Sequence, residues 1–280
     1  MRTLVHLSDL HFGSIRDTAV TPLIECVARI QPDVVAVSGD LTQRARREQF
    51  RAARDFLAQL SAPKVVVPGN HDVPLYNPLA RLRRLMRYRR YIVDDLEPFY
   101  CNGDMAVLGI NTARSLAFKG GRINAAQVAR AKARLGGLPD KVAKIIVTHH
   151  PFDLPPGCGR KILVGRGRMA IRALNECKID LFLAGHFHVS GAAPTTFEIP
   201  VDGYSSLIVQ AGTAISTRTR RELNTFNVIR FALPDLSVER IEWNPDNAAF
   251  AVAATEHFVR GANGWALKRL DIGAGEGLPL

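Results

Sequence analysis

The chain has 280 residues, of which 47% are hydrophobic, and 37 Lys and Arg against 26 Asp and Glu give it a net charge of +11. A chain of this size and composition can bury a substantial core, which excludes a small scaffold held together by disulfides. The positive charge favours anionic partners such as nucleic acid, phospholipid headgroups or phosphorylated small molecules, without choosing among them.

Short apolar runs alternate with helix-like segments along the first two-thirds of the chain. Buried strands are expected at Thr3–Leu7, Asp33–Ser38, Lys64–Val67, Met105–Ile110, Lys144–Thr148 and Asp180–Ala184. Helices are expected at Thr18–Ile30, Arg44–Leu60, Leu79–Tyr91, Ala125–Leu135 and Met169–Cys177. This alternation is typical of an α/β protein.

After His188 the pattern changes to strands separated by turns. These strands are expected at Thr195–Ile199, Ser206–Gln210, Phe226–Phe231 and Val238–Trp243. The sequence therefore predicts a sheet-rich α/β sandwich in a single domain over residues 1–272. A basic helical insert is expected near residues 76–100, and the Gly- and Pro-bearing residues 273–280 are expected to form a flexible tail.

The cysteines and the lack of a long apolar segment predict a cytoplasmic protein. The four cysteines contain no C-x-x-C pair and are expected to be reduced thiols. The N-terminal sequence MRTLVHLSDLHFG lacks the long apolar stretch of a signal peptide. The sequence also contains no run of about 18 apolar residues, so no membrane span is predicted. Peripheral attachment to a membrane surface stays open.

Metal-ligand side chains follow five of the predicted strands. In chain order the clusters are Asp9 with His11, Asp40, Asn70 with His71, His149, and His186 with His188. Ligands bind at the carboxyl ends of strands in open α/β sheets, so these side chains are expected to meet. Gly39, Gly69 and Gly185 precede three of the clusters and allow the backbone to turn sharply. His6 and His257 lie outside the clusters and are expected to be packed and exposed, respectively.

Oxygen and nitrogen donors without a thiolate suit Mn, Fe or Zn better than Mg or Ca. Two Asp, one Asn and four His are too many donors for one tetrahedral ion. Two divalent ions about 3.5–4 Å apart, with one Asp bridging them, would use the whole set. The sequence therefore predicts a binuclear metal site.

The same residues resemble the signature of the calcineurin-like metallophosphoesterases. The matching motifs are D-x-H at Asp9, G-D at Asp40, G-N-H-D at Asn70, His149, and G-H-x-H at His186. The resemblance covers about the first two-thirds of the chain. The stretches SGDLTQ, PGNHD and THHPF are most similar to the bacterial class III cyclic-nucleotide phosphodiesterases.

The resemblance implies a role for each site residue. The first metal would be held by Asp9, His11 and His188, and the second by Asn70, His149 and His186. Asp40 would bridge the two metals, which would share a nucleophilic hydroxide, and His71 would be the catalytic imidazole. The implied fold is two β-sheets packed face to face with helices outside. His150 follows a ligand and is expected either to support it or simply to be packed.

Arginines are the predicted contacts for the substrate phosphate, beside Asn70 and His71. Arg114 and the Arg44–Arg47 group are candidates, because a guanidinium offers phosphate two parallel donors. The stretch LARLRRLMRYRRY over Leu79–Tyr91 is interpreted in two ways. It is either a lid or anchor that meets an anionic membrane or polyanionic substrate, or a solvated helix whose arginines pair with nearby acids such as Asp94, Asp95 and Glu97.

Hydrolysis of a phosphodiester, with a cyclic nucleotide or another small diester as substrate, is the leading functional hypothesis. The alternative is cleavage of a phosphodiester or pyrophosphate in a nucleotide–lipid substrate at a membrane surface. Nucleic acid is not an expected partner, since neither a helix-turn-helix nor a basic strand set with interleaved aromatics is found. A non-catalytic binding scaffold ranks last, because His71 and every ligand are present. The sequence does not specify the oligomeric state.

Overall fold

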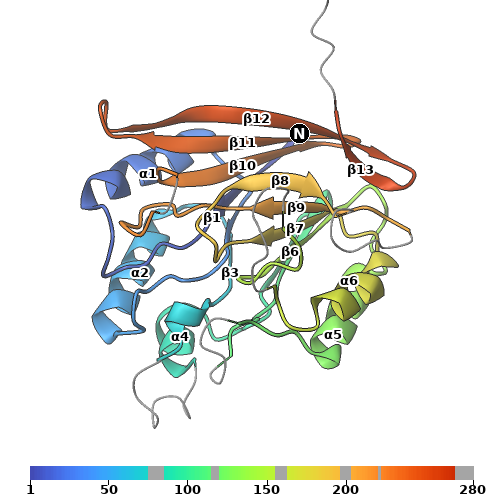
Figure 1. Cartoon of the computed structure of the whole chain (residues 1–280), viewed down its shortest axis with the longest axis horizontal. Helices are drawn as coiled ribbons and strands as arrows, with labels where there is room; N and C mark the ends of the chain where they lie inside the picture. Colours follow the sequence, from blue (N-terminus) through green and yellow to red (C-terminus); the bar gives the residue numbers. More distant parts are fainter. Residues whose placement is uncertain (75–84, 115–119, 155–162, 196–202, 220–221, 269–280) are drawn as a thin grey trace, which may run out of the picture.

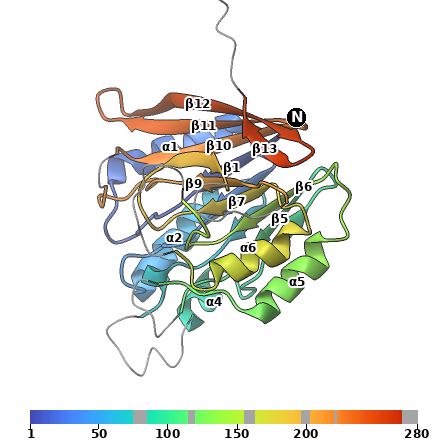
Figure 2. The same cartoon turned by 45° about the vertical axis from the view of Figure 1, so that its right-hand side comes forward.

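The computed structural model describes residues 1–74, 85–114, 120–154, 163–195, 203–219 and 222–268. Its strands form two mixed sheets that pack face to face, with helices on the outer faces (Figure 1, Figure 2). The predicted two-sheet sandwich flanked by helices is confirmed.

The first sheet has seven strands in the order β13-β12-β11-β10-β1-β2-β3. Their bounds are β1 Arg2–Leu7, β2 Val34–Val37, β3 Lys64–Val66, β10 Thr225–Ala232, β11 Asp235–Asn244, β12 Ala249–Gly261 and β13 Gly264–Leu267. Strands β1, β2 and β3 are parallel, whereas β10 pairs with β1 in the antiparallel sense. The carboxyl ends of β1, β2 and β3 therefore share one edge of the sheet.

The second sheet has six strands in the order β4-β5-β6-β7-β9-β8. Their bounds are β4 Phe99–Cys101, β5 Met105–Gly109, β6 Ala143–Val147, β7 Leu181–Ala184, β8 Gly191–Pro194 and β9 Leu207–Gln210. Strands β5, β6, β7 and β9 are parallel, so their carboxyl ends also share one edge.

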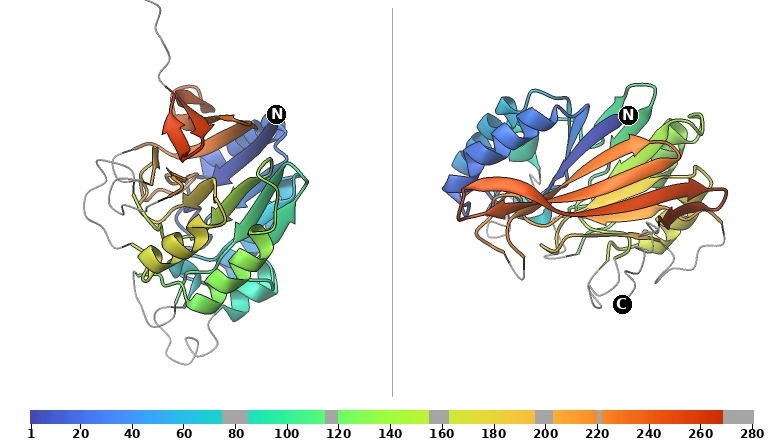
Figure 3. Two further views of the ribbon diagram at one scale, coloured as in Figure 1. Left: turned by 90° about the vertical axis from the view of Figure 1, so that its right-hand side faces the viewer. Right: turned by 90° about the horizontal axis from the view of Figure 1, so that it is seen from above.

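The helices form two outer layers. Helices α1 (Asp17–Ile30) and α2 (Arg47–Gln59) pack on the first sheet, and α5 (Ala125–Leu135) and α6 (Gly167–Asn175) pack on the second. The right-hand view of Figure 3 shows the two helix pairs on opposite sides of the molecule.

The central strands β1, β2, β5, β6, β7 and β9 are buried on both faces, which explains their unbroken apolar runs. In β1, Leu4 packs between the sheets in one cluster with Ile145, whereas Val5 packs with Leu23 of α1 in another cluster. His6 is buried in the same strand, and its Nε2 lies 2.9 Å from Ser38 Oγ, as expected for a packed histidine.

The helices and strands predicted before His188 are present within a few residues of their expected bounds, apart from the basic insert. In that insert, residues 79–84 lie outside the described residues, and α4 covers Met86–Tyr91. Strand β4 begins at Phe99, so the insert is not helical throughout. Nearly all of the predicted strand Thr195–Ile199, and the predicted tail 273–280, also lie outside the described residues.

Two described arginines of α4 have partners within the protein. Arg87 Nη1 donates to Ala45 O at 2.7 Å, and Arg89 Nη1 lies 2.9 Å from Asp94 Oδ1. Glu97 pairs instead with Arg130 at 2.6 Å. These contacts agree with the solvated-helix interpretation. No helix among the described residues is both long enough and apolar enough to cross a membrane.

Candidate metal centre

The strand ends bring the predicted ligands together at one edge of the sandwich. The candidate groups are Asp9, His11 and His188; Asp9, Asp40 and His149; and His149, His150 and His186. Within each group the possible ligand atoms lie within 4.8 Å of one another. Residues from both sheets therefore build a single site.

One half of the site consists of Asp9, His11 and His188. His11 Nε2 lies 3.2 Å from His188 Nε2, and Asp9 Oδ1 lies 3.6 Å and 3.2 Å from these two nitrogens. All three residues are buried. Asp9 Oδ1 has no hydrogen-bond partner among the described residues, as expected for an atom that faces a cation.

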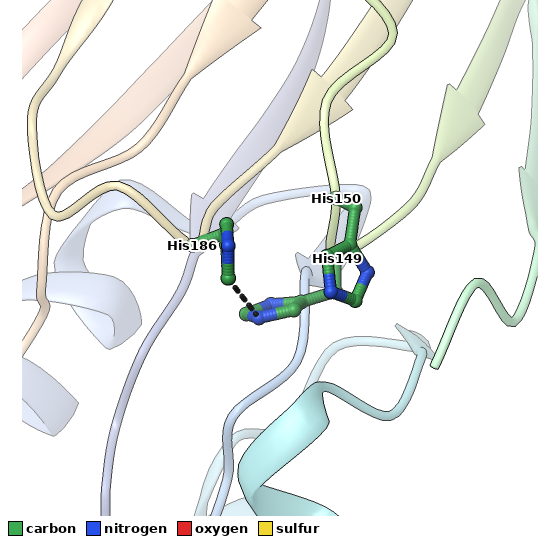
Figure 4. Close-up of side chains that lie close together, drawn as sticks. All are labelled: His149, His150 and His186. Atoms are coloured by element: carbon green, nitrogen blue, oxygen red, sulfur yellow. Dashed lines mark hydrogen bonds between the residues drawn. The ribbon is translucent and has the colours of Figure 1, made fainter. Parts of the chain in front are cut away.

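The other half consists of Asn70, His149 and His186. His149 Nε2 lies 3.0 Å from Asn70 Oδ1 and 3.2 Å from His186 Nδ1. Figure 4 shows His186 facing His149, with His150 beside them on the chain that leaves β6. Three potential donor atoms thus face one another here as well.

Asp40 lies between the two halves. Its Oδ2 is 3.9 Å from His11 Nε2 in the first half and 3.4 Å from His149 Nε2 in the second. Its Oδ1 accepts a hydrogen bond from the backbone N–H of His71 at 2.8 Å, which holds the carboxylate in this orientation. Asp40 therefore lies within 4 Å of a histidine nitrogen in each half of the site.

Backbone carbonyls determine which ring nitrogens face the site. His149 Nδ1 lies 2.8 Å from Ser38 O, and His188 Nδ1 lies 2.9 Å from Arg218 O. A carbonyl can only accept, so each Nδ1 carries the proton. The Nε2 atoms are therefore directed at the two clusters, which is the arrangement that metal-ligating histidines need.

Five site residues have left-handed backbone conformations, which are uncommon for residues other than glycine. Their φ angles are 50° for Asp9, 53° for His11, 51° for Asp40, 78° for His186 and 57° for His188. Such conformations carry a cost of order 1 kcal/mol or more each and gather at functional sites. The strand ends are therefore strained in order to aim these side chains inward.

Gly39 shows why a glycine precedes Asp40. Its φ is +89°, and an added Cβ would lie 2.7 Å from Gly69 N and 2.9 Å from His149 Nδ1. The loops after β2 and β3 approach each other too closely for any larger residue. The expected role of this glycine in a sharp turn is confirmed.

The charges of the site favour a bound cation. Burial would raise the pKa values of Asp9 and Asp40, but the nearby histidines hold both below the usual range. Burial would lower the pKa of His149, but the carboxylates of Asp40 and Asp9 raise it to about 9. Two buried carboxylates thus remain ionised and require positive charge beside them. The donor set and its charge fit two divalent ions.

His71 lies at the mouth of the site. Its ring contacts that of His11 edge to face at 4.9 Å between centroids. Its Nδ1 is 2.8 Å from Gln43 O, and its Nε2 is 3.0 Å from Arg218 Nη1. His150 is buried beside His149 and His186, with Nδ1 2.9 Å from Thr112 Oγ1.

Two of the arginines predicted to contact phosphate donate hydrogen bonds to other parts of the protein. Arg114 Nε donates to Arg122 O at 3.2 Å, and Arg47 Nε donates to Tyr91 OH at 2.8 Å. Neither contact involves the clustered ligands. Among the described residues, Arg218 contacts the predicted site residue His71, and the sequence did not single it out because no motif surrounds it.

Asp72, the last residue of G-N-H-D, was also not singled out. Its carboxylate accepts from the backbone N–H groups of Leu41 at 3.1 Å, Thr42 at 2.9 Å and Gly69 at 2.9 Å. Burial and the Asp40 charge raise its pKa to about 7. It ties together the loops that carry Asp40 and Asn70.

Residues 2–190 match the family model described as calcineurin-like phosphoesterase. The glycerophosphodiester phosphodiesterase GpdQ of Enterobacter lignolyticus is 28% identical over 169 residues, which are 54% of this chain and only 58% of that protein. A probable cyclic nucleotide phosphodiesterase of Synechococcus is 23% identical over 218 residues, which are 70% of this chain and 78% of that protein.

Two solved structures share the fold. The purple acid phosphatase PPD1 of yellow lupin has a TM-score of 0.67 at 13% identity, covering 91% of this chain and 53% of the lupin chain. A dimetal phosphatase of Danio rerio has a TM-score of 0.60 at 16% identity, and the match covers 85% of this chain and 95% of the Danio rerio chain. With the family match over residues 2–190, the chain belongs to the calcineurin-like phosphoesterases, a family that uses a dinuclear divalent metal centre.

Proposed function

We propose that the chain hydrolyses phosphodiesters at a centre of two divalent ions. Asp9, His11 and His188 would hold one ion, and Asn70, His149 and His186 the other. The observation that carries the proposal is the position of Asp40, whose Oδ2 lies 3.9 Å from a nitrogen of one half and 3.4 Å from a nitrogen of the other. When bound, two such ions supply Lewis acidity and lower the pKa of a water molecule.

The protein residues contribute orientation and proton transfer. His71 Nδ1–H donates to Gln43 O at 2.8 Å, which fixes the ring and leaves Nε2 facing outward. From there His71 would protonate the leaving alkoxide or contact the phosphate, which are roles that a positioned imidazole can serve. Asn70 would both hold an ion and orient the substrate.

A phosphodiester is favoured as substrate because two relatives carry that activity in their names. One is a glycerophosphodiester phosphodiesterase and the other a probable cyclic nucleotide phosphodiesterase. Cyclic nucleotides and small glycerol-type diesters are therefore the first natural classes to test. The oxygen and nitrogen donor set favours Mn or Fe, with Zn as a third choice.

The test compares bis(p-nitrophenyl) phosphate with p-nitrophenyl phosphate as substrates for the metal-stripped protein and for the same protein with Mn restored. We expect turnover that requires Mn and is faster with the diester. Turnover of neither substrate by protein shown to hold Mn would contradict the proposal and favour a non-catalytic scaffold.

A further inference from the structure

Arg218 extends from a segment beyond the matched family region, and it contacts His71 directly. The guanidinium Nη1 lies 3.0 Å from His71 Nε2 and 3.5 Å from Gln43 Oε1. We infer that Arg218 binds the anionic oxygens of the substrate phosphoryl group and makes the site selective for negatively charged phosphoesters. The inference rests on the proposed function, because it concerns the same site.

The main chain around Arg218 is held firmly in place. Arg218 O accepts from His188 Nδ1 at 2.9 Å, and Arg218 N donates to Ser216 Oγ at 3.0 Å. The preceding Thr217 donates its backbone N–H to Ser14 O at 2.9 Å. This segment follows β9, whose carboxyl end lies at the same sheet edge as those of β6 and β7. The side chain is therefore positioned over the site by contacts that do not involve the guanidinium.

The hydrogen bonds at His71 show what Arg218 does there. Gln43 O can only accept, so His71 Nδ1 carries a proton, and the guanidinium can only donate, so Nε2 carries a lone pair. His71 is thus neutral, and its outward nitrogen is covered by a donor. An imidazole with Nε2 covered in this way cannot give a proton to a leaving group.

The guanidinium lacks an anionic partner in the described structure. No carboxylate among the described residues forms an ion pair with Arg218, whose present acceptors are a neutral imidazole and a neutral amide. A phosphoryl oxygen is a stronger acceptor than either, and arginine can bind two such oxygens in parallel. Movement of Arg218 to an entering phosphodiester would pair its charge and uncover His71 Nε2. One side chain would therefore contact either His71 or the substrate phosphate.

A competing explanation is that Arg218 only fixes the His71 ring. The two roles differ in their dependence on substrate charge. A residue that fixes His71 serves every substrate with the same leaving group, whereas a phosphate-binding residue serves only substrates with an anionic phosphoryl group. Arg218→Ala separates these roles cleanly, since it keeps the backbone carbonyl that orients His188.

The experiment compares the Mn-loaded protein and its Arg218→Ala variant on bis(p-nitrophenyl) phosphate and on its uncharged methyl triester. For the diester we expect kcat/KM to fall about 10- to 100-fold, the effect of losing a hydrogen bond to a charged group. For the triester we expect little change. Added guanidinium should restore part of the diester activity. The control is Arg54→Ala, which removes the same charge from an exposed pair with Asp55 on α2.

Binding of inorganic phosphate to the Mn-loaded proteins, measured by calorimetry, gives a readout that needs no turnover. We expect the Kd to rise about 10-fold or more in Arg218→Ala and to stay unchanged in Arg54→Ala. If neither protein hydrolyses phosphoesters but the Kd changes as expected, the proposed function fails and the anion-binding role of Arg218 stands. An unchanged Kd, or an equal loss on diester and triester, would overturn the inference.

Discussion

His11 Nε2 and His188 Nε2 lie 3.2 Å apart, although 177 residues separate the two histidines in the sequence. One follows β1 of the first sheet and the other follows β7 of the second. The contact exists only because the two sheets pack with the carboxyl ends of their parallel strands at the same edge. The architecture of the sandwich and the chemistry of the site are therefore directly linked.

Asp40→Ala is expected to disrupt both halves of the site, because Asp40 lies between them. We expect less than two Mn per chain, and a loss of diester turnover of about 10³-fold or more, equivalent to about 4 kcal/mol of transition-state stabilisation. Metal analysis after gel filtration and steady-state kinetics measure the two effects. Full Mn content in this variant would show that Asp40 does not bridge.

His71→Ala is expected to separate catalysis from metal binding. His71 is absent from the three candidate ligand groups, so Mn content should stay at the wild-type level. Diester turnover should fall about 10²- to 10⁴-fold, the contribution of a positioned acid or base. A variant that loses Mn to the same extent as activity would make His71 a ligand or a structural residue instead.

Gly39→Ala tests the close approach of the loops after β2 and β3. The added Cβ would lie 2.7 Å from Gly69 N, at a φ of +89° that alanine rarely adopts. We expect the variant to be destabilised by about 1–3 kcal/mol in urea unfolding and to bind Mn less tightly. Gly137→Ala is a matched control, because its Cβ would meet nothing within 4 Å. Equal stability of the two variants would contradict this explanation.

Asp180 lies before β7, at the opposite end of that strand from His186. It is buried and accepts from Tyr204 OH at 3.0 Å, Arg260 Nη1 at 3.2 Å and Trp265 Nε1 at 2.9 Å. Asp180→Ala leaves these donors unpaired and should cost about 3–5 kcal/mol in urea unfolding. Turnover per folded molecule should be unchanged. A loss of turnover without a loss of stability would show that Asp180 supports catalysis and not the fold.

Contact of the basic stretch with an anionic membrane stays a prediction, as does the nucleotide–lipid substrate. Arg87 and Arg89 already bind Ala45 O and Asp94. Their replacement by alanine should therefore change binding to phosphatidylserine vesicles little, as measured by co-sedimentation. A strong loss of vesicle binding, together with lipid-stimulated turnover of the wild-type protein, would support the membrane-associated alternative instead.

The clustering of these side chains could be predicted from the sequence because they follow short, strongly apolar strands. Asp9 and Asp40 each come directly after such a strand, and a parallel sheet brings strand ends together. Strand β12 was missed for the opposite reason. Much of Ala249–Gly261 is alanine-rich and partly exposed, so the strand lacks the alternation that marks a buried face.

Arg218 could not have been found from local patterns. It lies in no motif, and its relation to His71 depends on a contact across 147 residues. Arg114 and Arg47 were predicted because they follow strands or clusters in the sequence, and they donate to Arg122 O and Tyr91 OH, respectively. A side chain several bonds long can point in many directions, and only tertiary packing decides which one it takes.

The central claim is a centre of two metal ions, and stepwise restoration of Mn to the stripped protein tests it most directly. Hydrolysis of bis(p-nitrophenyl) phosphate is measured against the number of Mn equivalents bound per chain. The structure predicts negligible turnover without metal and a maximum at two equivalents. Full activity at one equivalent, or activity that survives complete removal of metal, would contradict it.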